Sequence, residues 1–132
     1  MSDTTQKAQR PLSPHLQVYR LPLTALMSIS HRATGAALVL GTILVAAFLI
    51  AAAGGEAQYN FVMSIAMHPL GKIVLFFWSA ALYYHMCNGI RHMIWDTGCM
   101  LRKDTAMRSN YVVLVSAATL TVLTWAAACI SG

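Results

Sequence analysis

Two histidines near the end of an apolar segment could bind a metal-containing group. His85 and His92 are seven residues apart, so on a helix they share one face about 20° out of line. Neutral imidazole is a good ligand for iron, and a helical histidine can reach an iron held between the helices of a bundle. Gly89 lies one turn from His85 and removes a side chain from that face, which lets a flat group approach. The alternative is a histidine that hydrogen-bonds to a neighbouring helix.

Cationic groups follow His85 toward one end of the same segment. His92 lies roughly 10 Å from His85 along a helix, at about 1.5 Å per residue, where it and Arg91 could contact the propionates of a haem. No cysteine belongs to a CxxCH motif, so any haem would be non-covalent and of the b type. Taken alone, Arg91 and His92 also fit side chains that extend their charges to the membrane surface. Asp96 could pair with Arg91 or end the helix.

A second polar cluster, Ser28-Ile29-Ser30-His31-Arg32, precedes the first long apolar run. Ser28 and Arg32 are one helical turn apart and offer a hydroxyl and a guanidinium on the same face. Such donors suit a quinone oxygen, whose negative charge grows on reduction. The alternative is an interfacial arginine with serines that cap the helix. The nearby Gly35 and Gly41 indicate close packing of helices rather than chemistry.

These residues must be positioned by helices that cross a membrane. The 132 residues are 58% hydrophobic and only 10% charged, which does not describe an ordinary soluble domain. No Lys, Arg, Asp or Glu occurs in residues 33–55, 73–90 or 109–132. Each of these segments is close to the roughly 20 residues that cross a bilayer core about 30 Å thick. The sequence therefore predicts an all-α integral membrane protein with three transmembrane helices.

The expected organisation is an N-terminal arm, residues 1–20, followed by one transmembrane domain, residues 21–132. Two prolines in the arm block a regular helix there. The three helices are expected at about 21–53, 70–95 and 109–130. An outer loop over residues 56–69 is expected to lie along the membrane interface.

The basic residues lie almost entirely on one side of the membrane. Four of the nine precede the first apolar run and four lie at or between the second and third, which makes eight. They are Lys7, Arg10, Arg20, Arg32, Arg91, Arg102, Lys103 and Arg108. The positive-inside rule then predicts a multi-pass protein with a cytoplasmic N-terminus and a periplasmic C-terminus. Topology explains the net charge of +5, so no nucleic-acid partner is inferred.

The N-terminus has neither the apolar core of a secretory signal nor the pattern of an Arg-rich transit peptide. This favours a bacterial cell inner membrane over import into an organelle. The cysteines Cys87, Cys99 and Cys129 form no CxxC motif, so free thiols are expected.

Three motifs together resemble the cytochrome b membrane-anchor subunit of succinate dehydrogenase, which is respiratory complex II. They are Arg10-Pro11, the run Ser28-Ile29-Ser30-His31-Arg32-Ala33-Thr34-Gly35, and the run from His85 to Gly98. The last is highly specific: a histidine, three residues, Gly-Ile-Arg-His, two residues, an aromatic residue and an aspartate. The resemblance covers nearly the whole chain.

The resemblance implies a heteromeric helical bundle with a second small anchor subunit. His85 would be the axial haem b ligand on this chain, and the second subunit would supply the other. His31, Arg32 and His92 would contact the haem propionates. Ser28 and Arg32, with a tyrosine of the second subunit, would bind ubiquinone.

The resemblance also implies a division of labour between subunits. The family couples succinate oxidation in a flavoprotein, through an iron–sulfur subunit, to quinone reduction in the membrane anchor. The sequence has no cysteine set for iron–sulfur clusters and no nucleotide-binding glycine motif, which agrees with that division. On this interpretation the chain is a non-autonomous subunit of an enzyme of the tricarboxylic acid cycle and respiratory chain. It has no succinate-oxidising site of its own.

Two alternative functions remain open. An anchor of a quinol:fumarate reductase would take part in the same redox chemistry in reverse. A non-redox scaffold subunit would explain the three spans and the basic loops. It would leave His85 beside Gly89, and Ser28 beside Arg32, as coincidences.

Overall fold

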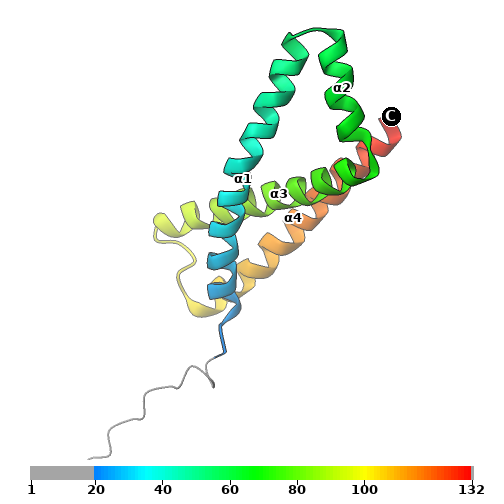
Figure 1. Cartoon of the computed structure of the whole chain (residues 1–132). Helices are drawn as coiled ribbons and strands as arrows, with labels where there is room; N and C mark the ends of the chain where they lie inside the picture. Colours follow the sequence, from blue (N-terminus) through cyan, green and yellow to red (C-terminus); the bar gives the residue numbers. More distant parts are fainter. Residues whose placement is uncertain (1–19, 132) are drawn as a thin grey trace, which may run out of the picture.

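The structure, a computed structural model, describes residues 20–131, and helix is the regular secondary structure found in this part of the chain. The elements are α1 (Leu23–Ala53), α2 (Glu56–Met67), α3 (Pro69–Asp96) and α4 (Lys103–Ser131) (Figure 1). The Arg10-Pro11 motif and nearly all of the N-terminal arm lie outside the described residues.

Three of these helices are long and apolar enough to cross a membrane: α1, α3 and α4. They have 31, 28 and 29 residues, so each exceeds about 40 Å and can span a hydrocarbon core of about 30 Å. Large apolar side chains such as Val39, Phe77 and Val115 are about two-thirds exposed within this chain. Such surfaces require lipid or another protein around them. The prediction of an all-α protein with three transmembrane helices is confirmed.

A fourth helix, α2, occupies most of the segment that was expected to be an outer loop. The chain reverses at Gly54 and at Gly55, whose φ of 105° lies in the left-handed region that favours glycine. Glu56 then begins α2 and places a carboxylate in its first turn, which suits the positive end of the helix dipole. As a result α2 runs back alongside the end of α1 (Figure 1).

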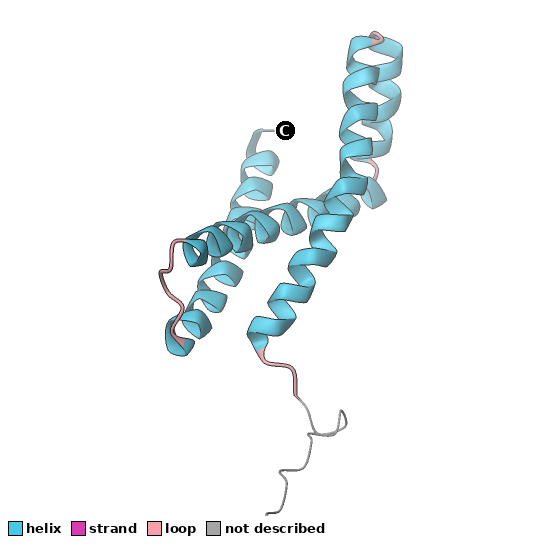
Figure 2. Ribbon diagram, turned by 90° about the vertical axis from the view of Figure 1, so that its left-hand side faces the viewer, coloured by secondary structure: helices cyan, strands magenta, loops and turns pink. Residues whose placement is uncertain are grey.

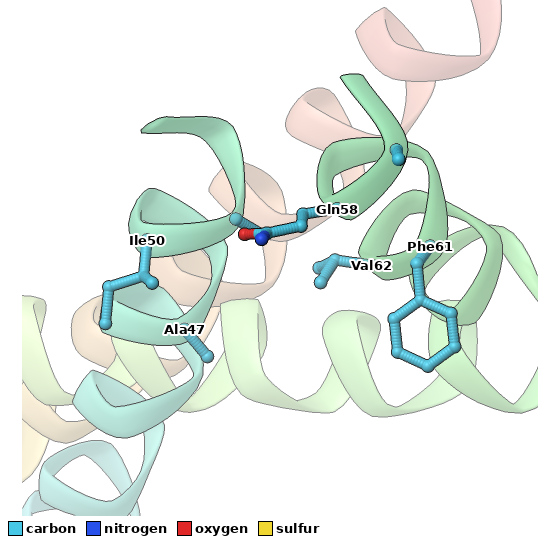
Figure 3. Close-up of a pocket in the computed structure, with 7 residues that line it drawn as sticks. Ala47, Ile50, Gln58, Phe61 and Val62 are labelled. Carbon is cyan, nitrogen blue, oxygen red and sulfur yellow. The ribbon is translucent and has the colours of Figure 1, made fainter. Parts of the chain in front are cut away.

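A mostly apolar pocket of about 530 Å³ lies between α1 and α2. Its lining residues are Ala47, Ile50, Ala51, Ala57, Gln58, Phe61 and Val62. Figure 3 shows Ile50 and Ala47 on α1 and Val62 on α2, with the Gln58 amide between the two helices. None of the candidate haem-binding or quinone-binding residues lines this pocket.

The first half of α1 crosses α3, and the second half continues beyond it with α2 alongside (Figures 1 and 2). Gly41 is buried on α1 and lies against the indole of Trp78 on α3. A Cβ atom on Gly41 would overlap that indole, so the glycine is what allows the close approach. The expectation that Gly41 serves helix packing is therefore confirmed.

Replacing Gly41 with valine should destabilise the protein because the added atoms overlap the Trp78 ring. Overpacking of this kind costs about 1–3 kcal/mol. Thermal unfolding of the purified protein would measure the effect, with Ala46→Val as the control because Ala46 is exposed on the same helix. Equal stability of the two variants would contradict the packing role of Gly41.

Candidate functional site

Three of the histidines selected from the sequence come together where α1 meets α3. The ring of His31 on α1 stacks on the ring of His85 on α3, with centroids 4.0 Å apart and planes inclined by 14°. The ring of His92, two turns further along α3, lies 5.3 Å from His31. The structure thus brings two motifs that are far apart in the sequence into one cluster, which we call the histidine cluster (His31, His85 and His92).

Helix α1 holds the His85 imidazole by its Nδ1 atom. That nitrogen lies 3.1 Å from the backbone oxygen of His31 and 3.3 Å from the Thr34 hydroxyl. Both partners belong to α1, one turn or less apart, so the histidine of one helix is oriented by the other. The alternative that His85 hydrogen-bonds to a neighbouring helix is therefore correct as geometry, and it does not exclude a ligand role.

Two glycines border the histidine cluster in different ways. A Cβ on Gly35 would lie 3.0 Å from Cε1 of His85, which is tighter than ordinary contact, so a larger residue there would displace the ring by a few tenths of an ångström. A Cβ on Gly89 would meet the described atoms only at Cε1 of His31, at an ordinary 3.9 Å. Packing within residues 20–131 therefore does not account for a glycine at position 89. A small side chain at position 89 would fit without a clash with the described residues.

Two polar atoms near the cluster are buried without a hydrogen-bond partner among the described residues. They are Nδ1 of His31 and Nε1 of Trp95. Trp95 packs edge-on against His92, with ring centroids 5.2 Å apart. Burying a polar atom without a partner is costly, so both atoms favour a bound polar group: the Trp95 N–H needs an acceptor, and Nδ1 of His31 can donate or accept according to its tautomer.

These side chains do not form a site for a bare metal ion. Within residues 20–131 no group of three or more His, Cys, Asp or Glu side chains is arranged to hold one.

Ser28 and Arg32 lie one turn apart on α1, as expected. Ser28 is half-buried and Arg32 is exposed, and no hydrogen bond of either side chain occurs in the part of the chain that the structure describes. The interpretation of the serines as helix caps is wrong, because α1 begins at Leu23 with Pro22 in the capping position.

The neighbouring Ser30 is occupied by contacts within the protein. Its hydroxyl shares a 2.6 Å hydrogen bond with the Tyr84 hydroxyl and donates to the backbone oxygen of Leu26 at 2.9 Å. The Tyr84 hydroxyl also lies 3.0 Å from the backbone oxygen of Met27, which can accept its single proton in place of Ser30. Tyr84 was missed in the sequence, although its position directly before His85 was a usable signal.

Arg91 points inward rather than toward the membrane surface. It is only 3% exposed, donates a hydrogen bond to Oδ1 of Asn110 on α4, and lies 4.4 Å above the Trp95 ring. The interpretation of Arg91 as a side chain that reaches for the surface is therefore wrong. Asp96 does not serve as its hydrogen-bond partner; it is exposed and is the last residue of α3.

Two fully buried amides, Asn88 and Asn110, also escaped the sequence interpretation. Asn110 donates to the Thr24 hydroxyl at 3.1 Å, and Asn88 donates to the backbone oxygen of Met27 at 3.4 Å. Together with Arg91 they form a polar network between α1, α3 and α4. An amide inside a charge-free apolar segment indicates such a network, because a polar group in a membrane is energetically unfavourable unless it is hydrogen-bonded.

Comparison with known proteins bears on what this site does. The family model described as succinate dehydrogenase/fumarate reductase transmembrane subunit matches residues 6–124. The chain is 41% identical over 118 residues to the succinate dehydrogenase cytochrome b556 subunit of Paracoccus denitrificans, covering 89% of this chain and 91% of that protein. It is 37% identical over 128 residues to the cytochrome b556 subunit of Rickettsia felis, with coverages of 95% and 99%. It is 36% identical over 124 residues to the cytochrome b560 subunit of Marchantia polymorpha, with 89% of each covered.

Proposed function

The chain belongs to the succinate dehydrogenase/fumarate reductase transmembrane subunit family, and from that premise we propose a specific role for it. It anchors a succinate dehydrogenase in the membrane, binds haem b and ubiquinone, and helps to pass electrons from the iron–sulfur subunit to the quinone. The observation that carries this proposal is the meeting of His31, His85 and His92 where α1 crosses α3.

The residues present fit a haem. His85 would be the axial ligand from this chain, and the space beside Gly89 would admit the edge of the macrocycle. His31, Arg32 and His92 would contact the propionates, and the buried Nδ1 of His31 has no other partner among residues 20–131. When bound, the haem would supply a one-electron carrier.

The quinone is bound by donors that the chain does not use for itself. Ser28 and Arg32 share one face of α1, whereas the Ser30 hydroxyl is engaged by Tyr84. Hydrogen bonds from the hydroxyl and the guanidinium orient one quinone carbonyl. As the quinone is reduced, negative charge grows on that oxygen, and the Arg32 charge stabilises it. The side chains thus stabilise the negatively charged oxygen that develops during reduction, before protons neutralise it to give the quinol.

The proposed partners would supply groups that the haem and quinone sites need in addition to those of this chain. A second small anchor subunit would provide the other haem ligand and a tyrosine for the quinone, and would cover part of the exposed apolar surface of α1, α3 and α4. The iron–sulfur subunit, which connects to the flavoprotein, would dock on the basic side. That side is cytoplasmic and the C-terminus periplasmic, in a bacterial inner membrane.

The alternative of a fumarate reductase anchor is less well supported. The description of the family model names both enzymes, whereas the relatives compared above are all named as subunits of succinate dehydrogenase. Rates of the purified complex with ubiquinone and with a low-potential menaquinone would separate the two directions.

Replacing Ser28 with alanine tests the quinone site. Loss of one hydrogen bond of about 1.4 kcal/mol should lower succinate:ubiquinone reductase activity about tenfold. Succinate oxidation by a soluble dye, which bypasses the membrane subunit, should not change.

The matched control is Ser64→Ala, because Ser64 is exposed on α2 and its hydroxyl bonds to the backbone oxygen of Phe61 in its own helix. This variant should keep the wild-type rate with both acceptors. A fully assembled Ser28→Ala complex with normal ubiquinone reductase activity would contradict the proposed site.

A further inference from the structure

We propose that Thr34 and the backbone carbonyl of His31 fix the tautomer of His85, so that Nδ1 carries the proton and Nε2 is left to bind iron. Thr34 is then a positioning residue for the haem ligand, located on a different helix from the ligand itself. This inference rests on the proposed haem function.

The contact with the His31 carbonyl determines where the proton lies. The Nδ1 atom of His85 is 3.1 Å from that oxygen. A carbonyl oxygen has no proton and can only accept, so this contact is a hydrogen bond only when Nδ1 carries the hydrogen. In the neutral imidazole one nitrogen donates and the other accepts, and the lone pair is then on Nε2.

The contact with Thr34 also requires the proton on Nδ1 of His85, for a separate reason. Its hydroxyl lies 2.9 Å from the backbone oxygens of both Ser30 and His31, and it donates its single proton to one of them. The lone pairs of Oγ1 remain, and these face Nδ1 of His85 at 3.3 Å. Both neighbours of Nδ1 are therefore acceptors, and no arrangement of protons lets Thr34 donate to His85 while it keeps its bond to the helix.

These hydrogen bonds leave the second ring nitrogen, Nε2, without a hydrogen-bond partner among the described residues. Every hydrogen bond of the His85 side chain within residues 20–131 uses Nδ1. The ring is held in place by the stacked His31 and by the bare backbone at Gly35. One turn of α1 thus contacts the His85 ring with the carbonyl and ring of His31 and the hydroxyl of Thr34, and Gly35 leaves room for that ring.

Such a contact has a predictable effect on a metal ligand. Histidines that bind metals almost always donate the second ring N–H to an oxygen, which fixes the tautomer and makes the ligating nitrogen more basic. Loss of an acceptor of this kind typically weakens metal affinity 10–100-fold. A less basic nitrogen also stabilises ferric iron less than ferrous iron, so the midpoint potential of the haem should rise.

The experiment compares the intact purified complex with its Thr34→Val and Thr34→Ser variants. Valine lacks the hydroxyl, so we expect a higher midpoint potential and roughly tenfold weaker haem retention. Serine keeps the hydroxyl and should remain close to the wild type in both. The matched control is Thr42→Val, since Thr42 is exposed on α1 and bonds to the backbone oxygen of Val39 in its own helix. Redox titration of the b-type spectrum measures the potential, and haem content after dilution measures retention.

The outcomes separate this inference from the function on which it rests. If Thr34→Val prevents assembly, Thr34→Ala removes the same hydroxyl with less bulk and carries the same expectation. Wild-type potential and retention in a variant without the hydroxyl, in a complex whose haem depends on His85, would overturn the role of Thr34 alone. A wild-type complex without haem, or one whose spectrum does not depend on His85, would overturn the proposed haem function and this inference with it.

Discussion

A complex that carries His85→Ala is expected to lose its low-spin b-type spectrum, or to show it strongly altered. The Nδ1 atom of His85 contacts the His31 carbonyl and the Thr34 hydroxyl of α1, whereas its Nε2 atom makes no hydrogen bond with the described residues. Alanine removes the proposed iron ligand, and neither His31 nor His92 is held in the same way. A reduced-minus-oxidised visible spectrum of the complex, purified through this subunit, measures the effect.

The control for this variant is His68→Asn. His68 is exposed, precedes α3, and accepts a hydrogen bond from the backbone nitrogen of Leu70 at the start of that helix. Asparagine also serves as a helix cap, so the spectrum and the assembly should both be unchanged. An unaltered spectrum in an assembled His85→Ala complex would mean that the ligand is another residue. Absence of haem from the wild-type complex would favour a quinone-binding anchor without haem, or a non-redox scaffold.

The sequence indicated the candidate site residues because they are polar or ionisable side chains in or next to apolar segments. His85, His92 and the Ser28-to-Arg32 cluster stand out because ionisable side chains are rare in membrane spans. Helical periodicity placed His85 and His92 on one face, and the structure brings His31 to them from α1. The pairing of the two motifs depends on how α1 crosses α3, which local periodicity does not contain.

The ends of the helices were harder to predict. Hydropathy marks the part of a helix that lies within the bilayer, and a helix can extend beyond that part. Helix α4 begins at Lys103, ahead of the apolar run, since charged residues form helix readily once outside the bilayer. Helix α2 was missed because Gly54-Gly55 and the polar stretch around Gln58 are typical of a loop. In the structure the two glycines make the turn, and the polar stretch continues as a helix.

The direction of Arg91 could not be predicted for a related reason. An arginine at the end of a span normally reaches for water. Here two buried amides on α3 and α4 lie within the bundle, and Asn110 provides an acceptor that makes the inward position tolerable. An amide carries no charge, so the pattern of charged residues along residues 109–132 gives no sign of this partner.

Replacing Asn110 with leucine is expected to destabilise the protein by about 3 kcal/mol. Asn110 accepts from Arg91 on α3 and donates to Thr24 on α1, so one side chain on α4 connects the three spanning helices. Leucine has a similar volume but no acceptor, and it leaves a guanidinium that is 3% exposed without that partner. The Nε and Nη2 atoms of Arg91 already lack hydrogen-bond partners among residues 20–131, so only the Trp95 ring and the sulfur of Met27 would remain to stabilise the charge.

Thermal unfolding of the purified complex tests this, with Asn60→Leu as the control because Asn60 is exposed on α2. The decisive variant is the double replacement Arg91→Met with Asn110→Leu. Removing one partner of a buried polar pair leaves the other uncompensated, whereas replacing both with apolar groups is often close to neutral. The double variant should therefore be more stable than Asn110→Leu alone. If it is equally unstable, the loss comes from packing or from the Thr24 bond, and the buried charge of Arg91 is not what Asn110 compensates.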